Sequence, residues 1–115
     1  THAQFDVVGM TTAHMKKAAA LGGRMELCAL GMLTGPDSPL EFMRHSARVE
    51  LAETAACIRA VGARHFVPGT DLGQTGNPTP VDGLQMFVAA LMAHGIPAAE
   101  IQTMGREVPG SLLMG

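Results

Sequence analysis

The carboxylate of Asp71 is the strongest candidate for chemistry in this sequence of 115 residues. It follows a short apolar stretch around Phe66 and Val67 that predicts a β-strand, and it precedes a loop rich in glycine and proline at residues 72–80. In parallel α/β folds, ligands and metal ions bind at the carboxyl ends of strands. We therefore expect Asp71 to bind a metal ion or to accept a proton from an activated water molecule.

Two further residues have side chains that could complete a metal site with Asp71. His2 lies in a segment that has the character of a strand's last residues, and Glu26 lies on a strand predicted over residues 24–30. Imidazole nitrogens and carboxylate oxygens both bind zinc-like divalent ions, at about 2.0–2.2 Å. Asp71, His2 and Glu26 are therefore candidate ligands of a divalent ion, for which Zn²⁺ is the expected metal.

Each of these residues also has a simpler structural interpretation. Asp71 could cap its own glycine-rich loop, Glu26 could pair with Arg24, and His2 could belong to a disordered terminus. A different chemistry, in which Thr1 acts as an amino-terminal nucleophile, is a further alternative. The remaining histidines are weaker candidates, because we expect them on helices, in a loop or before a strand: His14, His45, His65 and His94.

Helices and strands alternate along the chain. The patterns predict a helix from about residue 12 to 21, a strand at 24–30, a long loop at 31–46, a helix ending at 61, a strand around 66–67, a helix through 84–92, a short helix at 98–104 and a packed final turn with Leu112 and Leu113. In the third main helix, one apolar stripe is expected to be buried: Leu84, Phe87, Val88, Leu91 and Met92. This order predicts an α/β fold with a parallel sheet.

Composition limits the class of protein. A net charge of −2 and a pI of about 6.1 give no electrostatic reason to expect nucleic acid or an anionic membrane as a partner. The longest apolar run, residues 86–93, is much shorter than the roughly 18–20 residues that span a bilayer. Cys28 and Cys57 are expected to be small core residues and not a disulfide, which favours the reducing cytoplasm.

Several segments resemble the amidohydrolase superfamily of metal-dependent hydrolases, which includes the phosphotriesterase-like enzymes. Residues 69–74 and 77–84, which read GTDLGQ and NPTPVDGL, resemble the last barrel strand and the loop that follows it. Residues 58–63, which read IRAVGA, resemble the junction that precedes this strand, and residues 108–115, which read VPGSLLMG, resemble the closing turn. The resemblance implies that residues 1–115 are a single partial domain, the carboxyl-terminal three βα units of a (β/α)₈ barrel.

The resemblance also implies a function. The aspartate after the last strand of such a barrel binds metal and helps to activate water, which matches Asp71, and a histidine after an earlier strand matches His2. The His-x-His pair of the first barrel strand has no counterpart in these residues. We therefore expect another chain or a missing amino-terminal half to complete the barrel, and a small amide, ester or lactone as substrate. The alternative is a non-catalytic half-barrel scaffold.

Overall fold

Two parallel strands organise the fold. The computed structural model describes residues 1–115, and in it β1 (Met25–Cys28) pairs with β2 (Phe66–Gly69) over their full lengths, with Met25 opposite Phe66 and Cys28 opposite Gly69. The molecule is a mixed α/β structure with 55% helix. The predictions of an α/β fold and of a parallel sheet are therefore confirmed, whereas two strands do not by themselves define part of a barrel.

The predicted helices lie in the predicted order. The helical elements are α1 (Thr12–Ala20), the 3₁₀ helix η1 (Ala29–Leu33), α2 (Glu41–Arg44), α3 (Leu51–Val61), the 3₁₀ helix η2 (Ala63–His65), α4 (Pro80–Ala93), α5 (Ala98–Gln102), the π-helical segment η3 (Thr103–Glu107) and α6 (Val108–Met114). However, the segment predicted as a loop at 31–46 also contains a short helix, α2, and the end of η1. The strand predicted over residues 24–30 is shorter than expected, because the chain turns into η1 directly after Cys28. No helix combines the length and the apolar character that crossing a membrane requires.

Side-chain caps fix where the two helices α1 and α4 begin. The Thr11 hydroxyl accepts a hydrogen bond from the backbone N–H of His14, and the His14 ring accepts one from the N–H of Thr11. At α4, the Thr79 hydroxyl accepts from the backbone N–H of Asp82, and Pro80 occupies the first helical position, which needs no N–H donor. The predicted start of α1 at about residue 12 agrees with the structure, whereas the cap of α4 at Thr79 was not predicted.

The carboxyl-terminal helices follow one another without a break. Helix α5 continues through η3 into α6, and Pro109, which lacks an N–H, stands at the start of α6. Pro109 cannot donate a hydrogen bond to the preceding turn. The π-helical register of η3, just before it, is consistent with this missing donor. The prediction that Leu112 and Leu113 pack in a final turn is wrong, because they are 58% and 87% exposed.

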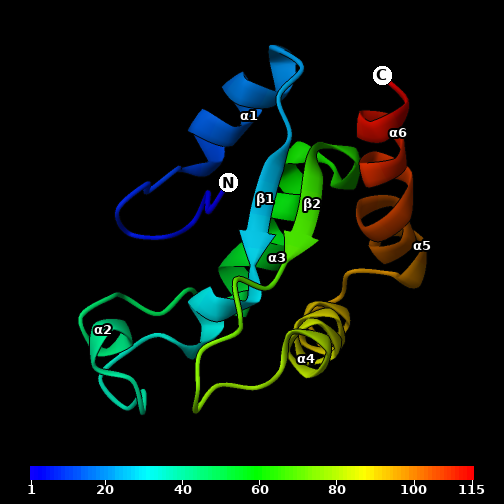
Figure 1. Ribbon diagram of the computed structural model, residues 1–115. Coiled ribbons are helices and arrows are strands. Elements are labelled where there is room, and N and C mark those ends of the chain that lie inside the picture. Colours follow the sequence, from blue (N-terminus) through cyan, green and yellow to red (C-terminus); the bar gives the residue numbers. More distant parts are fainter.

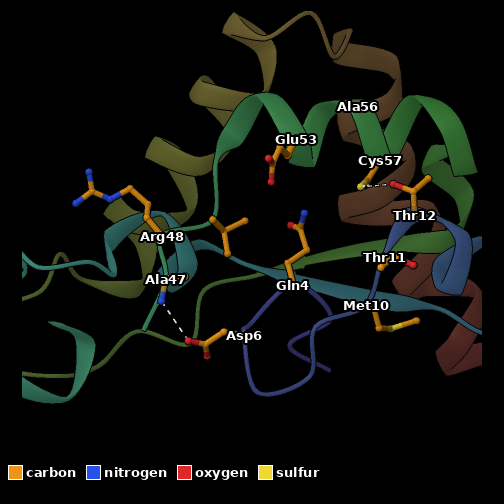
Figure 2. A pocket seen from close by; sticks show the side chains of 11 residues that line it. Gln4, Asp6, Met10, Thr11, Thr12, Ala47, Arg48, Glu53, Ala56 and Cys57 are labelled. Carbon is orange, nitrogen blue, oxygen red and sulfur yellow. Dashed lines mark hydrogen bonds between the residues drawn. The ribbon is translucent and has the colours of Figure 1, made fainter. Parts of the chain in front are cut away.

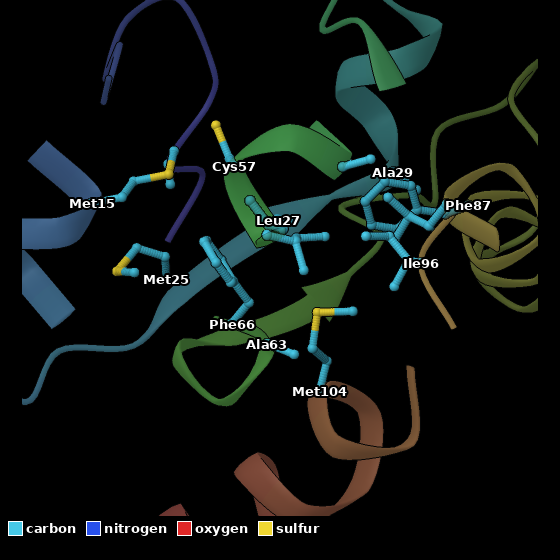
Figure 3. Close-up of a cluster of buried hydrophobic side chains, with 14 residues drawn as sticks. Met15, Met25, Leu27, Ala29, Cys57, Ala63, Phe66, Phe87, Ile96 and Met104 are labelled. Carbon is cyan, nitrogen blue, oxygen red and sulfur yellow. The ribbon is translucent and has the colours of Figure 1, made fainter. Parts of the chain in front are cut away.

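The hydrophobic core lies on one face of the sheet. Met25, Leu27 and Phe66 of the strands cluster with buried side chains of α1, α3, α4 and η3, as Figure 3 shows. The apolar stripe predicted on α4 is only partly buried. Phe87 and Leu91 are buried, whereas Leu84 and Met92 are exposed.

The opposite face of the sheet carries no helix. In Figure 1, α3 lies behind β1 and β2, and no element lies in front of them. Successive side chains of a strand point to opposite faces, so Glu26 and Cys28 of β1 share this open face with Val67 and Gly69 of β2. All four residues are of intermediate exposure.

The amino-terminal segment lies beside β1. The Ala3 N–H donates to the Glu26 carbonyl at 3.2 Å, and the Met10 N–H donates to the Ala3 carbonyl at 3.0 Å. The strand end predicted for residues 1–5 is therefore a single backbone link and not a strand. Beyond the paired strands, the Leu30 N–H donates to the Thr70 carbonyl at 3.0 Å and holds the two strand exits together.

Phe66 should be a main contributor to stability, because its side chain is fully buried between the sheet and the helices. We expect Phe66→Ala to lower the free energy of unfolding by about 3–5 kcal/mol, since it removes apolar contacts and leaves a cavity. Val7→Ala is the matched control at an 89% exposed position and should change stability by less than about 0.5 kcal/mol. Urea denaturation followed by circular dichroism measures both values, and equal losses in the two variants would contradict this view of the core.

Candidate metal centre

His2 and Asp71 meet at the open face of the sheet. Their side chains approach to 2.9 Å between His2 Nε2 and Asp71 Oδ2, although 69 positions separate them in the sequence. The two side chains are 38% and 39% exposed. The contact is therefore accessible to solvent. The simpler interpretation required the Asp71 carboxylate to cap its own loop, but the carboxylate contacts His2 instead.

Glu26 approaches the same histidine from the middle of β1. Its Oε2 lies 3.9 Å from His2 Nδ1, and its side chain is 31% exposed. Arg24 does not pair with it, because the Arg24 guanidinium donates to the backbone carbonyls of Gly22 and Gly23. The structure thus brings together all three residues that the sequence predicted for a metal site.

Gly69 makes room for the Glu26 carboxylate. Glu26 leans from β1 across the neighbouring strand, and a Cβ atom added at Gly69 would collide with its Oε1. Any larger residue at position 69 would have to push this carboxylate away. The close approach explains why β2 ends in a glycine next to the cluster.

The backbone at His2 and Asp71 is in an unusual conformation. They are the two non-glycine residues with positive φ angles, 57° and 53° respectively. The left-handed region is unfavourable for residues that carry a Cβ, and such conformations concentrate at functional sites. Both residues of the 2.9 Å contact are therefore held in a strained conformation by the fold around them.

The segment after Asp71 is anchored at two points. The Gln74 side-chain amide donates to the Asp71 carbonyl at 2.8 Å. The Leu72 side chain packs so closely on buried Gly83 of α4 that a Cβ at that position would overlap it. Together these contacts fix the direction in which the chain leaves β2, and with it the position of the Asp71 carboxylate.

Cys28 is a member of the cluster that the sequence analysis missed. Ligand atoms of His2, Glu26 and Cys28 all lie within 4.8 Å of one another. We expected both cysteines to be core residues, which holds for buried Cys57 but not for Cys28, which is partly exposed. The signal was present in the sequence, because Cys28 follows Glu26 by two positions and therefore shares its face of the strand.

The surroundings of Cys28 favour its protonated thiol over the thiolate. Burial raises its pKa to about 11, and the negative charges of Glu26 and Asp71 act in the same direction, while the His2 backbone N–H partly offsets them. A cation placed among these groups would reverse this effect, because it favours the thiolate.

The donor set fits a borderline-soft divalent ion. Ligands at about 2.0–2.3 Å from one tetrahedral ion are roughly 3–4 Å from each other. The separations of up to 4.8 Å among the His2, Glu26 and Cys28 atoms thus require only a small closure around an ion. Imidazole and thiol suit Zn²⁺ and related transition metals, whereas Mg²⁺ and Ca²⁺ prefer oxygen ligands alone.

The cluster does not line a cavity of this chain. A pocket of about 470 Å³ lies between the amino-terminal loop, the segment before α3 and α3 itself (Figure 2). Its charged lining consists of Asp6, Arg48 and Glu53, and none of the cluster residues lines it. Arg48 is already engaged, because its guanidinium contacts Asp37 and the Thr34 carbonyl. The metal candidates therefore stand on an open sheet face and not in a preformed pocket.

The other histidines have separate contacts outside the cluster. His14 belongs to the cap of α1, the His65 ring accepts from Arg64, and the His94 carbonyl accepts from Arg59. His45 is exposed at the end of α2. The structure thus brings none of these four to the cluster, in line with their low rank in the sequence analysis.

Comparisons with protein-family models, curated proteins and solved structures found no match to this chain.

The pH dependence of alkylation should report the raised pKa of Cys28. In a Cys57→Ala variant, which leaves one thiol, we expect the iodoacetamide rate to rise about tenfold per pH unit between about pH 7 and pH 10, because only the thiolate reacts. The rate should level off near the pKa of about 11. A plateau that begins near pH 9 would contradict the negative, partly buried surroundings described above.

Proposed function

We propose that this chain contributes the metal centre of a metal-dependent hydrolase of the amidohydrolase type. The supporting observation is the convergence of His2, Glu26 and Asp71, from three separate segments, on the uncovered face and exit side of a parallel sheet. Ligand and metal sites of α/β proteins occur at this end of the strands. The strained backbone at His2 and Asp71 is a second, independent sign of a functional site.

A divalent ion bound here would supply a Lewis acid that lowers the pKa of water and polarises a carbonyl or related group. The protein's own part begins with His2 and Glu26, whose donor atoms face each other and are available as ligands. Asp71 lies next to His2, where its partly exposed carboxylate could join the ligands, orient the imidazole or accept the proton of an attacking water. The substrate class that suits this chemistry is a small amide, ester or lactone.

The open sheet face supports the barrel part of the proposal. The inward side of a barrel strand alternates with the helix-covered side, as Glu26 and Cys28 alternate with Met25 and Leu27. A companion chain or an amino-terminal half would cover this face, close the sheet and supply the missing His-x-His ligands. We also propose that the protein functions in the reducing cytoplasm. Its two free thiols support this location.

One observation favours the second candidate, a scaffold without catalytic function. No cavity of this chain includes the cluster, so a substrate would find no enclosing walls unless a partner provides them. Metal content separates the two functions, because the hydrolase requires a stoichiometric ion and the scaffold does not.

Removal of the Asp71 carboxylate tests the proposal. We expect the purified chain to bind about one Zn²⁺, and Asp71→Ala to weaken Zn²⁺ binding by about 10- to 100-fold, because the carboxylate either binds the ion or orients its histidine. Titration against a competing chelator measures the affinity, and circular dichroism verifies the fold.

Glu53→Ala is the matched control for this experiment, because Glu53 is an exposed carboxylate on α3 outside the cluster. Its Zn²⁺ affinity should equal that of the unmodified chain. Unchanged affinity in Asp71→Ala, or no stoichiometric Zn²⁺ in the unmodified chain, would refute the proposal.

A further inference from the structure

We infer that Cys28 is a ligand of the metal centre and that His2 binds the ion through Nδ1, with Asp71 holding the other ring nitrogen. This inference rests on the proposed function, since it presupposes an ion at the cluster. It adds a sulfur ligand that the superfamily resemblance does not imply, and it assigns a separate part to each of the two nitrogens of His2.

The two ring nitrogens of His2 point to different partners. Nε2 lies 2.9 Å from Asp71 Oδ2, whereas Nδ1 lies on the side of Glu26, at 3.9 Å from its Oε2. A neutral imidazole that donates Nε2–H to a carboxylate presents a lone pair at Nδ1. Metal-binding histidines commonly donate their second N–H to a carboxylate, which fixes the tautomer and the orientation of the ring.

Glu26, which lies on the Nδ1 side of the His2 ring, brings a third candidate ligand with it. Glu26 and Cys28 are two positions apart on β1, so the strand itself fixes their common direction. Their ligand atoms and that of His2 lie within 4.8 Å of one another, and Asp71 is not part of this group of three. An ion placed here would have one nitrogen, one oxygen and one sulfur ligand.

Cys28 is better explained as a ligand than as a core residue. It is outside the buried hydrophobic cluster, to which Cys57 belongs, and it lies on the open face. Three protein ligands leave a fourth tetrahedral position free, which is the arrangement of catalytic zinc sites. The sulfur atom also narrows the choice of metal, because thiolate favours Zn²⁺ over Mg²⁺, Mn²⁺ and Ca²⁺.

Cobalt substitution tests the sulfur ligand. In the full chain with Cys57→Ala, Co²⁺ should bind at one equivalent and produce a thiolate-to-cobalt charge-transfer band in the near ultraviolet. The band should disappear in the double variant Cys28→Ser, Cys57→Ala, with Co²⁺ affinity reduced at least about tenfold. Circular dichroism verifies the fold, and Cys28→Ala replaces Cys28→Ser if the serine variant does not fold.

The outcomes separate the inference from the proposal on which it rests. Stoichiometric Co²⁺ without the band would overturn the assignment of Cys28 and leave the metal centre in place. Absence of stoichiometric Co²⁺ and Zn²⁺ would overturn both.

A second measurement tests the assignment of the ring nitrogens. Long-range ¹H–¹⁵N correlation spectra of the Zn²⁺-loaded, Cys57→Ala chain should show His2 with Nδ1 bound to metal and Nε2 protonated. Asp71→Asn should preserve the cobalt charge-transfer band, because Asp71 acts through the imidazole. Coordination through Nε2 would instead place the ion between His2 and Asp71 and overturn this part of the inference.

Discussion

The register of the parallel pair β1–β2 is the constraint on which the rest of the structure depends. With Met25 opposite Phe66, the large apolar side chains of both strands fall on the side of α3, and Glu26 and Cys28 fall on the other. A shift of one residue in either strand would exchange its two faces, burying charge in the core and exposing apolar side chains. The stability of the core and the composition of the cluster therefore have the same origin.

The sequence predicted the elements better than their packing. Caps and glycines are local signals, so the predicted start of α1 near Thr11 and the predicted end of α3 before Gly62 agree with the structure. How much of an apolar stripe is covered depends on neighbours that no local pattern specifies. This is why Phe87 of α4 is buried while Leu84, one turn earlier, remains 38% exposed.

The candidate site was predictable where topology alone decides. Asp71 follows the predicted strand β2, and ligands bind at the carboxyl ends of parallel strands, so its place at the site could be expected. His2 reaches Asp71 from a segment beside β1 that is not a strand, so the topology of the sheet did not predict this contact. The strained φ angles and the space at Gly69 depend on details of chain direction that emerge only in three dimensions. Cys28 was missed because cysteine is most often a small core residue, although its two-residue spacing from Glu26 placed it on the polar face.

The positive φ angles of His2 and Asp71 set a limit on how far this fold could be stabilised. A left-handed conformation costs a residue with a Cβ about 1–2 kcal/mol, and glycine would relieve most of this cost. Glycine at either position would also delete the imidazole or the carboxylate. Directed evolution for heat resistance would thus favour replacement at the same two positions whose side chains the proposed metal centre requires, so the two aims conflict at these positions.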